Sequence, residues 1–111
     1  MNEYPQRGQV YWVVLDPTIG SEIAKTRPAL IISNNAGNQY ASRVIVAPIT
    51  SKVSKVFPFE VKITLNDVQG KILLDQIRAI DKRRIKSIIA TVESDTMQMV
   101  DQALKVVLAL N

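Results

Sequence analysis

Residues 28–50, PALIISNNAGNQYASRVIVAPIT, contain two long apolar runs. Pro28–Ser33 and Arg43–Thr50 are rich in β-branched residues, which favour strands, and a polar segment with turn residues separates them. Proline cannot donate a hydrogen bond to a neighbouring strand, so Pro48 predicts an edge or a bulge near the end of the second run. The stretch therefore predicts two strands joined by a turn-rich loop.

Three more segments have the pattern of strands. Val10–Leu15 is an unbroken apolar run, as expected of a buried strand. Phe57–Leu65 alternates apolar and polar residues, which is typical of a half-buried strand. Lys71–Ile80 is mostly apolar, and Asp75 and Gln76 interrupt it. Five short strands are therefore predicted in all.

Helical spacing appears only near the C-terminus. Asp81 can cap a short helix in which Ile85, Ile88 and Ile89 share one face. Ser94 can cap a longer helix, whose apolar stripe we assign to the core or to a subunit contact: Met97, Val100, Leu104, Val107 and Leu108. The predicted fold class is mainly β, a strongly curved sheet or small barrel with a terminal helix packed on it.

The composition limits both the class of protein and its chemistry. A chain of 111 residues can form one domain with a modest core, which we assign to residues 1–111, and so small a core favours oligomerisation. There is no cysteine or histidine, which excludes thiol nucleophiles, histidine bases and the commonest zinc ligands. The N-terminus is too polar for a signal peptide, and no apolar run approaches the roughly 20 residues of a membrane helix. We therefore expect a soluble cytoplasmic protein.

The net charge of +4 is unevenly distributed. Residues 1–90 hold 13 of the 14 Lys and Arg residues but only 7 of the 10 acidic ones. One interpretation is a solvated surface that keeps the protein soluble. The other is attraction to a polyanion, most plausibly a nucleic acid.

Charged side chains gather just before the first run. Glu22, Lys25 and Arg27 precede Pro28, which restricts Arg27 to an extended conformation where the strand begins. A guanidinium held in this way offers the planar set of donors that suits a phosphate. The alternative is a surface ion pair between Arg27 and Glu22, worth about 0–1 kcal/mol, and the stretch taken alone favours that alternative.

A second polar cluster ends the other run. Thr50, Ser51 and Lys52 supply two hydroxyl groups and a cation at a strand end, where a rigid scaffold commonly displays functional side chains. Each is an ordinary turn residue by itself. Together with Arg27 they are candidates for lining one groove.

Three segments give the chain a family resemblance. RGQVYWVVLDPTIGSEIAKTRPALIISNN (residues 7–35), VAPITS (46–51) and LLDQIRAIDKRRI (73–85) resemble, in order and spacing, the MazF/PemK family of toxin–antitoxin endoribonucleases. The resemblance implies an SH3-like barrel of the MazF/CcdB type with a C-terminal helix. It also implies a homodimer that cuts single-stranded RNA at short sequences, without metal or other cofactor.

The resemblance also implies roles for individual residues. Arg27 and Thr50 match the family's catalytic pair, and the loop of residues 51–59 is of a kind that varies and sets sequence preference. Lys25 and Lys52, from the charged clusters above, join the positions expected to bind RNA: Ser21, Glu22, Lys25, Ser51, Lys52 and Gln76.

The chemistry expected of these side chains is simple, because RNA carries its own nucleophile, the 2′-hydroxyl. The protein must align that group, stabilise charge on the phosphoryl oxygens and move two protons. Arg27 suits charge stabilisation and Thr50 can donate to a phosphoryl oxygen, giving a 2′,3′-cyclic phosphate and a 5′-hydroxyl. The general base stays open, because arginine does not readily lose its proton and the cations beside Glu22 weaken it as a base.

Two further groups have open interpretations. The aromatic residues could stack on unpaired bases, but each is expected in the core instead, Trp12 above all: Tyr11, Trp12, Tyr40, Phe57 and Phe59. The basic cluster Lys82–Lys86 is either a contact for backbone phosphate or the solvated face of a short helix.

A growth-arresting ribonuclease needs a restraint, and the resemblance implies a MazE-like antitoxin with an acidic, disordered tail that folds against the basic surface. Three other functions remain as alternatives: a gyrase poison of the same fold, a noncatalytic RNA-binding module and a structural dimerisation domain. The chain ends in VVLALN and lacks the Trp-Gly-Ile ending expected of the gyrase poison.

Overall fold

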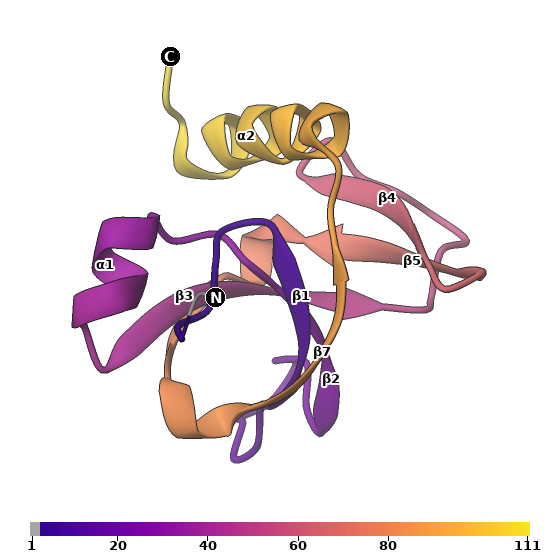
Figure 1. The fold of residues 1–111 in the computed structure, drawn as a ribbon. Coiled ribbons are helices and arrows are strands. Elements are labelled where there is room, and N and C mark those ends of the chain that lie inside the picture. The colour runs from indigo at the N-terminus through magenta and orange to yellow at the C-terminus, as the bar shows by residue number, and fades with distance from the viewer. Residues whose placement is uncertain (1–2) are drawn as a thin grey trace.

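The computed structural model describes residues 3–111, so the first two residues of the polar N-terminal stretch lie outside it. An antiparallel sheet curls beneath one long helix (Figure 1). The strands are β1 (Gln9–Val14), β2 (Thr26–Ile31), β3 (Arg43–Thr50), β4 (Glu60–Leu65), β5 (Val68–Leu73), β6 (Arg78–Asp81) and β7 (Ile85–Thr91). The helices are α1 (Asn35–Tyr40) and α2 (Ser94–Leu108), with single 3₁₀ turns η1 (Leu74–Gln76) and η2 (Lys82–Arg84). The expected mainly β fold with a terminal helix is confirmed.

Strand β3 is the centre of the sheet, whose order is β4-β5-β3-β2-β1-β7 with β6 also paired to β3. One edge of β3 pairs with β2, while its other edge pairs first with β6, up to Val46, and then with β5, from Ile49. Pro48 lies between those two segments and has no N–H to leave unpaired. The irregularity expected at this proline is therefore a change of strand partner.

The unbroken apolar runs are explained by two core clusters that share the central strands. Cluster 1 faces α2 and takes Leu30 of β2 and Ala47 and Ile49 of β3, among others. Cluster 2 takes the alternate residues of the same strands, including Ala29 and Ile31. Both faces are buried over Ala29–Ile31 of β2 and Val46–Ile49 of β3, and every residue in these two segments is apolar.

Helix α2 covers cluster 1 with the stripe that its spacing predicts. Val100 and Ala103 are buried, and Met97, Leu104 and Val107 pack around them. Two details differ from expectation: the capping position is Glu93, without a side-chain hydrogen bond, and Leu108 is half exposed. Arg7 anchors the helix by an ion pair of 2.6 Å with Asp101 while donating to the Ile32 carbonyl oxygen.

The predicted helix after Asp81 is wrong. Asp81 does accept a hydrogen bond from the Arg83 backbone, but the turn that it caps ends at Arg84. Residues 85–91 then form β7, an edge strand that pairs with β1 through two register shifts. The isoleucine spacing fits one helical face, but pairing with β1 outweighs that local preference.

Three other boundaries differ from the sequence predictions. The strand predicted from Phe57 begins at Glu60, and the strand predicted over residues 71–80 is broken by η1 at Asp75 and Gln76 into β5 and β6. The polar loop between β2 and β3 contains the short helix α1, whose first turn is capped by the Asn34 side chain.

Within the described chain, no helix combines the length and apolar character that crossing a bilayer requires.

Gly70 of β5 allows the close approach of β3 that the topology needs. A Cβ atom there would lie 3.0 Å from the Thr50 carbonyl oxygen and 3.1 Å from Ile49 Cγ2. We expect Gly70→Ala to lower the free energy of unfolding by about 1–3 kcal/mol, as overpacking does. Urea denaturation measures this, with Gly37→Ala in α1 as the control, because a methyl group there meets only a side chain, at 3.4 Å or more. Equal stability of the two variants would contradict the steric argument.

Candidate functional site

Arg27 lies in β2, across from Val13 of β1. Its Nε donates a hydrogen bond to the Ala24 carbonyl oxygen, 2.9 Å away, which holds the guanidinium at the end of the β1–β2 loop. The surface ion pair with Glu22 is not formed: Glu22 instead accepts from the Ile19 backbone N–H at 2.7 Å. In the described part of the chain, the terminal amino groups of Arg27 have no acceptor, so they are available to another group.

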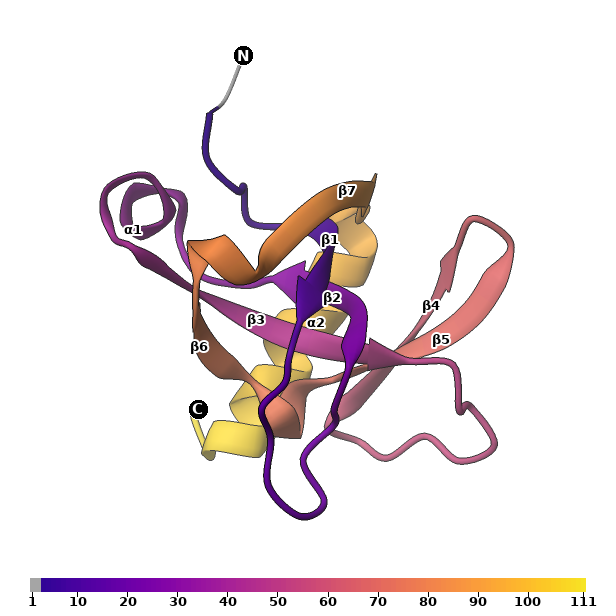
Figure 2. The same cartoon turned by 90° about the horizontal axis from the view of Figure 1, so that it is seen from below.

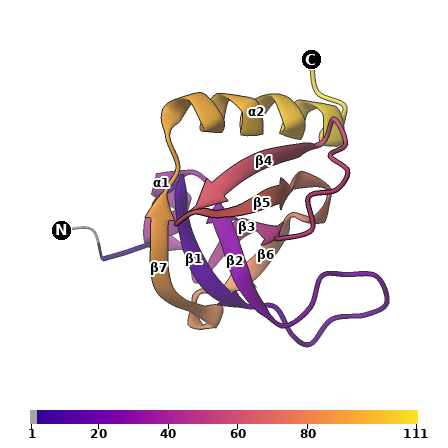
Figure 3. The same ribbon diagram turned by 90° about the vertical axis from the view of Figure 1, so that its right-hand side faces the viewer.

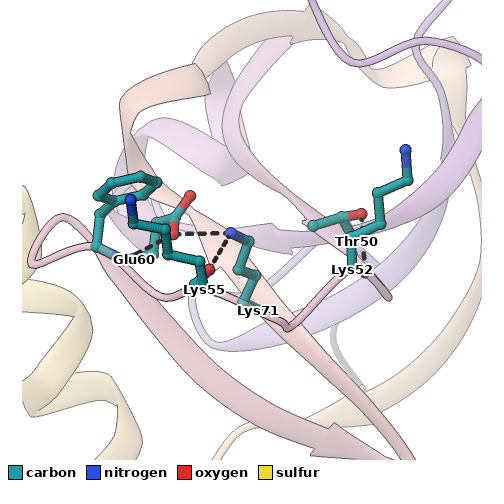
Figure 4. Close-up of polar contacts among 6 residues, drawn as sticks. Thr50, Lys52, Lys55, Glu60 and Lys71 are labelled. Carbon is teal, nitrogen blue, oxygen red and sulfur yellow. Dashed lines mark hydrogen bonds and ion pairs between the residues drawn. The ribbon is translucent and has the colours of Figure 1, made fainter.

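Thr50 is the last residue of β3 and is only 8% exposed. Its Oγ1 accepts a hydrogen bond from the Lys52 backbone N–H at 3.3 Å, which ties the start of the next loop to the strand end (Figure 4). Because Oγ1 is the acceptor in this contact, the hydroxyl proton remains free for donation. Lys71 of β5 pairs with Thr50 from the other side.

Arg27 and Thr50 occupy corresponding positions on neighbouring strands. The β2–β3 register pairs Ala29 with Pro48. Arg27 lies two residues before Ala29 and Thr50 lies two residues after Pro48, and because the strands are antiparallel both lie toward the same end of the pair. Alternate residues of a strand share a face, so both side chains belong to the face that carries cluster 2. The fold therefore brings the two predicted catalytic side chains to the same end of the same face.

Two cavities are lined by residues predicted for the site. The Trp12 cavity, of about 370 Å³, is lined by Trp12, Arg27 and Ser51 among mainly apolar neighbours. The Glu22 cavity, of about 510 Å³, contains several of the predicted RNA-binding residues in its lining: Ser21, Glu22, Ile23, Asp75, Gln76, Ile77 and Arg78.

The predicted RNA-binding residues are thus divided between these cavities. Ser51 lies with Arg27, whereas Ser21, Glu22 and Gln76 lie together in the other cavity. Lys25 and Lys52 line neither; both are exposed, and Lys25 has a left-handed backbone conformation with φ of 73°.

The β1–β2 loop, residues 15–25, is held at its base and at its far side. At the base, Leu15 N–H donates to the Lys25 carbonyl oxygen at 2.9 Å. At the far side, Ile23 N–H donates to Gln76 Oε1 at 2.8 Å. This loop and the 51–59 loop project on one side of the molecule (Figure 3). Gln76 therefore uses its acceptor to fix a loop of the site.

The basic cluster after β6 is partly committed to the fold. Arg83 forms a two-point contact with Asp81, whose pKa is lowered by the hydrogen bonds from Arg83, while the same pairing raises the pKa of Arg83. Arg84 donates to the carbonyl oxygens of Val14 and Asp16. Because Arg83 and Arg84 are bound within the fold, the cluster has fewer free donors than its sequence indicates, and Lys86 is exposed.

Two residues near the site were missed or misassigned from the sequence. Trp12, expected in the core, is 41% exposed and lines the cavity that contains Arg27. Arg78 lines the Glu22 cavity and donates to the Leu15 carbonyl oxygen at 3.0 Å. The sequence could have indicated Arg78, because it lies two residues after Gln76 in the segment 73–85 that carries part of the family resemblance.

Comparison with known families identifies the chain over most of this fold. Residues 6–108 match the model of the PemK-like, MazF-like toxins of type II toxin–antitoxin systems. The match spans nearly all of the described fold, including the strand ends that carry Arg27 and Thr50. The chain belongs to this family.

Individual relatives are similar over almost their whole length. Endoribonuclease EndoA of Bacillus subtilis (strain 168) is 40% identical over 110 residues, which cover 95% of each chain. The crystal structure of MazF from Deinococcus radiodurans has a TM-score of 0.86 at 29% identity, covering 98% of this chain and 100% of that one. An endoribonuclease in complex with its cognate antitoxin, from Mycobacterial species, has a TM-score of 0.81 at 29% identity, covering 96% and 97%.

We expect Gln76→Leu to loosen the β1–β2 loop, because Ile23 N–H loses its acceptor. A net hydrogen-bond contribution near 1 kcal/mol corresponds to about a fivefold faster hydrogen exchange at Ile23. Amide exchange followed by NMR measures this, with Gln39→Leu on the exposed side of α1 as the control. An unchanged rate at Ile23 would show that other contacts hold the loop.

Proposed function

We propose that this protein is an endoribonuclease toxin that cuts single-stranded RNA at short specific sequences and is neutralised by a cognate antitoxin. Family membership and the relatives named as endoribonucleases support this function. The observation that carries it in this chain is the position of Arg27, whose free amino groups lie on the same strand-end face as the Thr50 hydroxyl.

The proposed reaction uses the substrate's own 2′-hydroxyl as the nucleophile. Its oxygen attacks the adjacent phosphorus, the bond to the 5′-oxygen breaks, and the products are a 2′,3′-cyclic phosphate and a 5′-hydroxyl. Arg27 stabilises the charge that develops on the phosphoryl oxygens, and Thr50 donates a hydrogen bond to one of them. Since neither step requires a metal-bound nucleophile, we propose that cleavage is metal-independent.

The cavities suggest how RNA would be held. An unpaired base can stack on an exposed indole, and both Trp12 and Arg27 line one cavity. Ser21, Glu22 and Gln76 offer hydrogen-bonding groups in the other. We propose that nucleotides on the two sides of the cut occupy these two cavities.

The proposed partners are a second copy of the chain and an acidic antitoxin. The positive net charge of the chain favours an acidic tail. An endoribonuclease from Mycobacterial species has been solved in complex with its cognate antitoxin, and a MazE-MazF structure is known from Deinococcus radiodurans, which supports such a partner here. The chain also leaves several large apolar side chains of β5, β7, α2 and the residues after α2 half or more exposed, and a partner chain would cover some of this area: Val68, Ile88, Met99, Val106, Leu108 and Leu110.

We expect Arg27→Ala and Thr50→Val each to slow cleavage, the arginine variant by at least about 10²–10³, as when a transition-state donor is removed. Arg43→Ala, at the exposed opposite end of β3, is the matched control. Purified proteins are incubated with a long single-stranded RNA in excess EDTA, and both new termini are mapped. Wild-type rates in Arg27→Ala would refute the assignment, and loss of wild-type cleavage in EDTA would refute metal independence.

The same assay separates the other functions. RNA binding without cuts would indicate a noncatalytic module, inhibition of gyrase without cuts would indicate the poison, and dimerisation alone would indicate a structural domain.

We expect Lys86→Glu to weaken RNA binding if the exposed end of the basic cluster contacts backbone phosphate. Loss of one such contact should also reduce the slope of log affinity against log salt by about 0.7 for single-stranded RNA. Titrations with the catalytically inactive Arg27→Ala protein measure both, and Lys105→Glu on α2 is the control for net charge. Identical affinities and slopes for the two lysine variants would assign Lys86 to the solvated surface.

A further inference from the structure

The 51–59 loop between β3 and β4 is held by a buried ion pair. Lys71 Nζ of β5 lies 2.9 Å from Glu60 Oε1 of β4, and the two side chains are only 12% and 6% exposed. The register pairs Lys62 with Lys71 and Glu60 with Leu73, so the pair is a diagonal contact across the β4–β5 hairpin. Figure 4 shows the Lys71 side chain directed toward Glu60 and Lys55, away from Lys52.

Both members of the pair also bind the loop backbone. Lys71 Nζ donates to the Lys55 carbonyl oxygen at 2.6 Å, and Glu60 Oε1 accepts from the Phe57 N–H at 2.9 Å. Two charge-assisted hydrogen bonds therefore fix the loop at positions two residues apart.

The fixed segment presents a surface that suits RNA. The Phe57 ring is 39% exposed and stacks on Phe59 with a centroid separation of 5.4 Å. Lys55 Nζ lies 4.8 Å from the centre of the Phe57 ring and has no ion-pair partner among the described residues. An exposed aromatic ring beside a free cation can bind a base and a phosphate of one nucleotide. Lys71 Nζ also lies 5.8 Å from the centre of the Phe57 ring, but its charge is neutralised by Glu60.

The pair also lies next to the proposed catalytic position. Lys71 is the β5 partner of Thr50, and the loop begins immediately after Thr50 with Ser51 and Lys52. One residue of β5 therefore contacts the strand that ends in the catalytic hydroxyl and fixes the loop that follows it.

Stability alone is a weak reason for such a pair. Burying two charges costs several kcal/mol of desolvation, and well-packed apolar residues of similar volume often stabilise a fold equally well or better. What apolar residues cannot replace is the hydrogen bonding of both charges to the loop backbone.

We propose that the Glu60–Lys71 pair is a positioning device for substrate recognition, which holds Phe57 and Lys55 where they contact a nucleotide close to the cut. This inference rests on the proposed ribonuclease function. It makes Lys71 and Glu60 positioning residues: they act through the loop and touch no substrate. Removing the pair should therefore change which RNA sequences are cut more than how fast a bound RNA is cut.

The test compares the double variant Glu60→Met/Lys71→Met, which removes both the acceptor of the Phe57 N–H and the donor to Lys55, with Lys71→Arg, which keeps the charge, and with Lys62→Met, which removes an exposed neighbouring lysine. On an oligonucleotide containing the wild-type cutting sequence, we expect KM to rise at least about tenfold in the double variant while kcat stays within about threefold. Its cuts in a long RNA should spread over more sequences. Lys71→Arg should keep most of the affinity of wild type for this oligonucleotide, and Lys62→Met should resemble wild type.

Two further measurements keep the result interpretable. Thermal unfolding establishes that each variant is folded, and Phe57→Ala, which leaves the buried pair in place, should reproduce the rise in KM. Hydrogen exchange at the Phe57 amide, which needs no RNA, should be at least about tenfold faster in the double variant than in wild type.

Each outcome bears on a different claim. Unchanged KM and cutting sites in a folded double variant or in Phe57→Ala would overturn the inference, as would a fall in kcat at constant KM. If wild type cuts no RNA, the proposed function itself fails, and the recognition role fails with it.

Discussion

The constraint on which the structure depends is the position of β3 between three other strands. One edge of β3 pairs with β2, and the other edge pairs first with β6 and then with β5. The change of partner occurs at Pro48, which has no N–H group that would need an acceptor. Gly70 permits the close contact with the end of β3. Figure 2 shows the β4–β5 hairpin extending from that end. The burial of both faces of β3 and the termination of its apolar pattern at Thr50 follow from this arrangement.

The cations of the protein are used in two different ways. Arg7, Arg78 and Arg84 donate to backbone carbonyl oxygens, and Lys71 is neutralised by a buried carboxylate. These side chains hold loops and strand ends together. Arg27 is intermediate, because its Nε is bound to Ala24 while its terminal groups are free. The number of cations therefore overstates the donors that are free to bind a polyanion, and the distribution of those free donors is more informative.

Much of the fold could be predicted from the sequence, because β-branched runs and the α2 stripe are strong local signals. The predicted helix over Ile85–Ile89 was wrong because the isoleucines have helical spacing, and only the pairing with β1, which is distant in sequence, makes this segment a strand. The exposure of Trp12 was missed for a similar reason: an apolar run does not show which of its side chains the rest of the sheet leaves uncovered.

For the site, the proline after Arg27 indicated a fixed guanidinium, and the strand register now supports its relation to Thr50. The Glu60–Lys71 pair could not be found in this way, because it depends on a diagonal contact within a hairpin.

The pairing of β1 with β7 has a consequence for synthesis of the protein. Gln9 is paired with Thr91, and α2, which follows β7 in the chain, covers cluster 1. Contacts between segments so far apart in sequence form late and slowly. A ribosome must therefore translate the chain through β7 and α2 before the nascent protein can close its sheet, so a chain interrupted before these elements lacks a completed core.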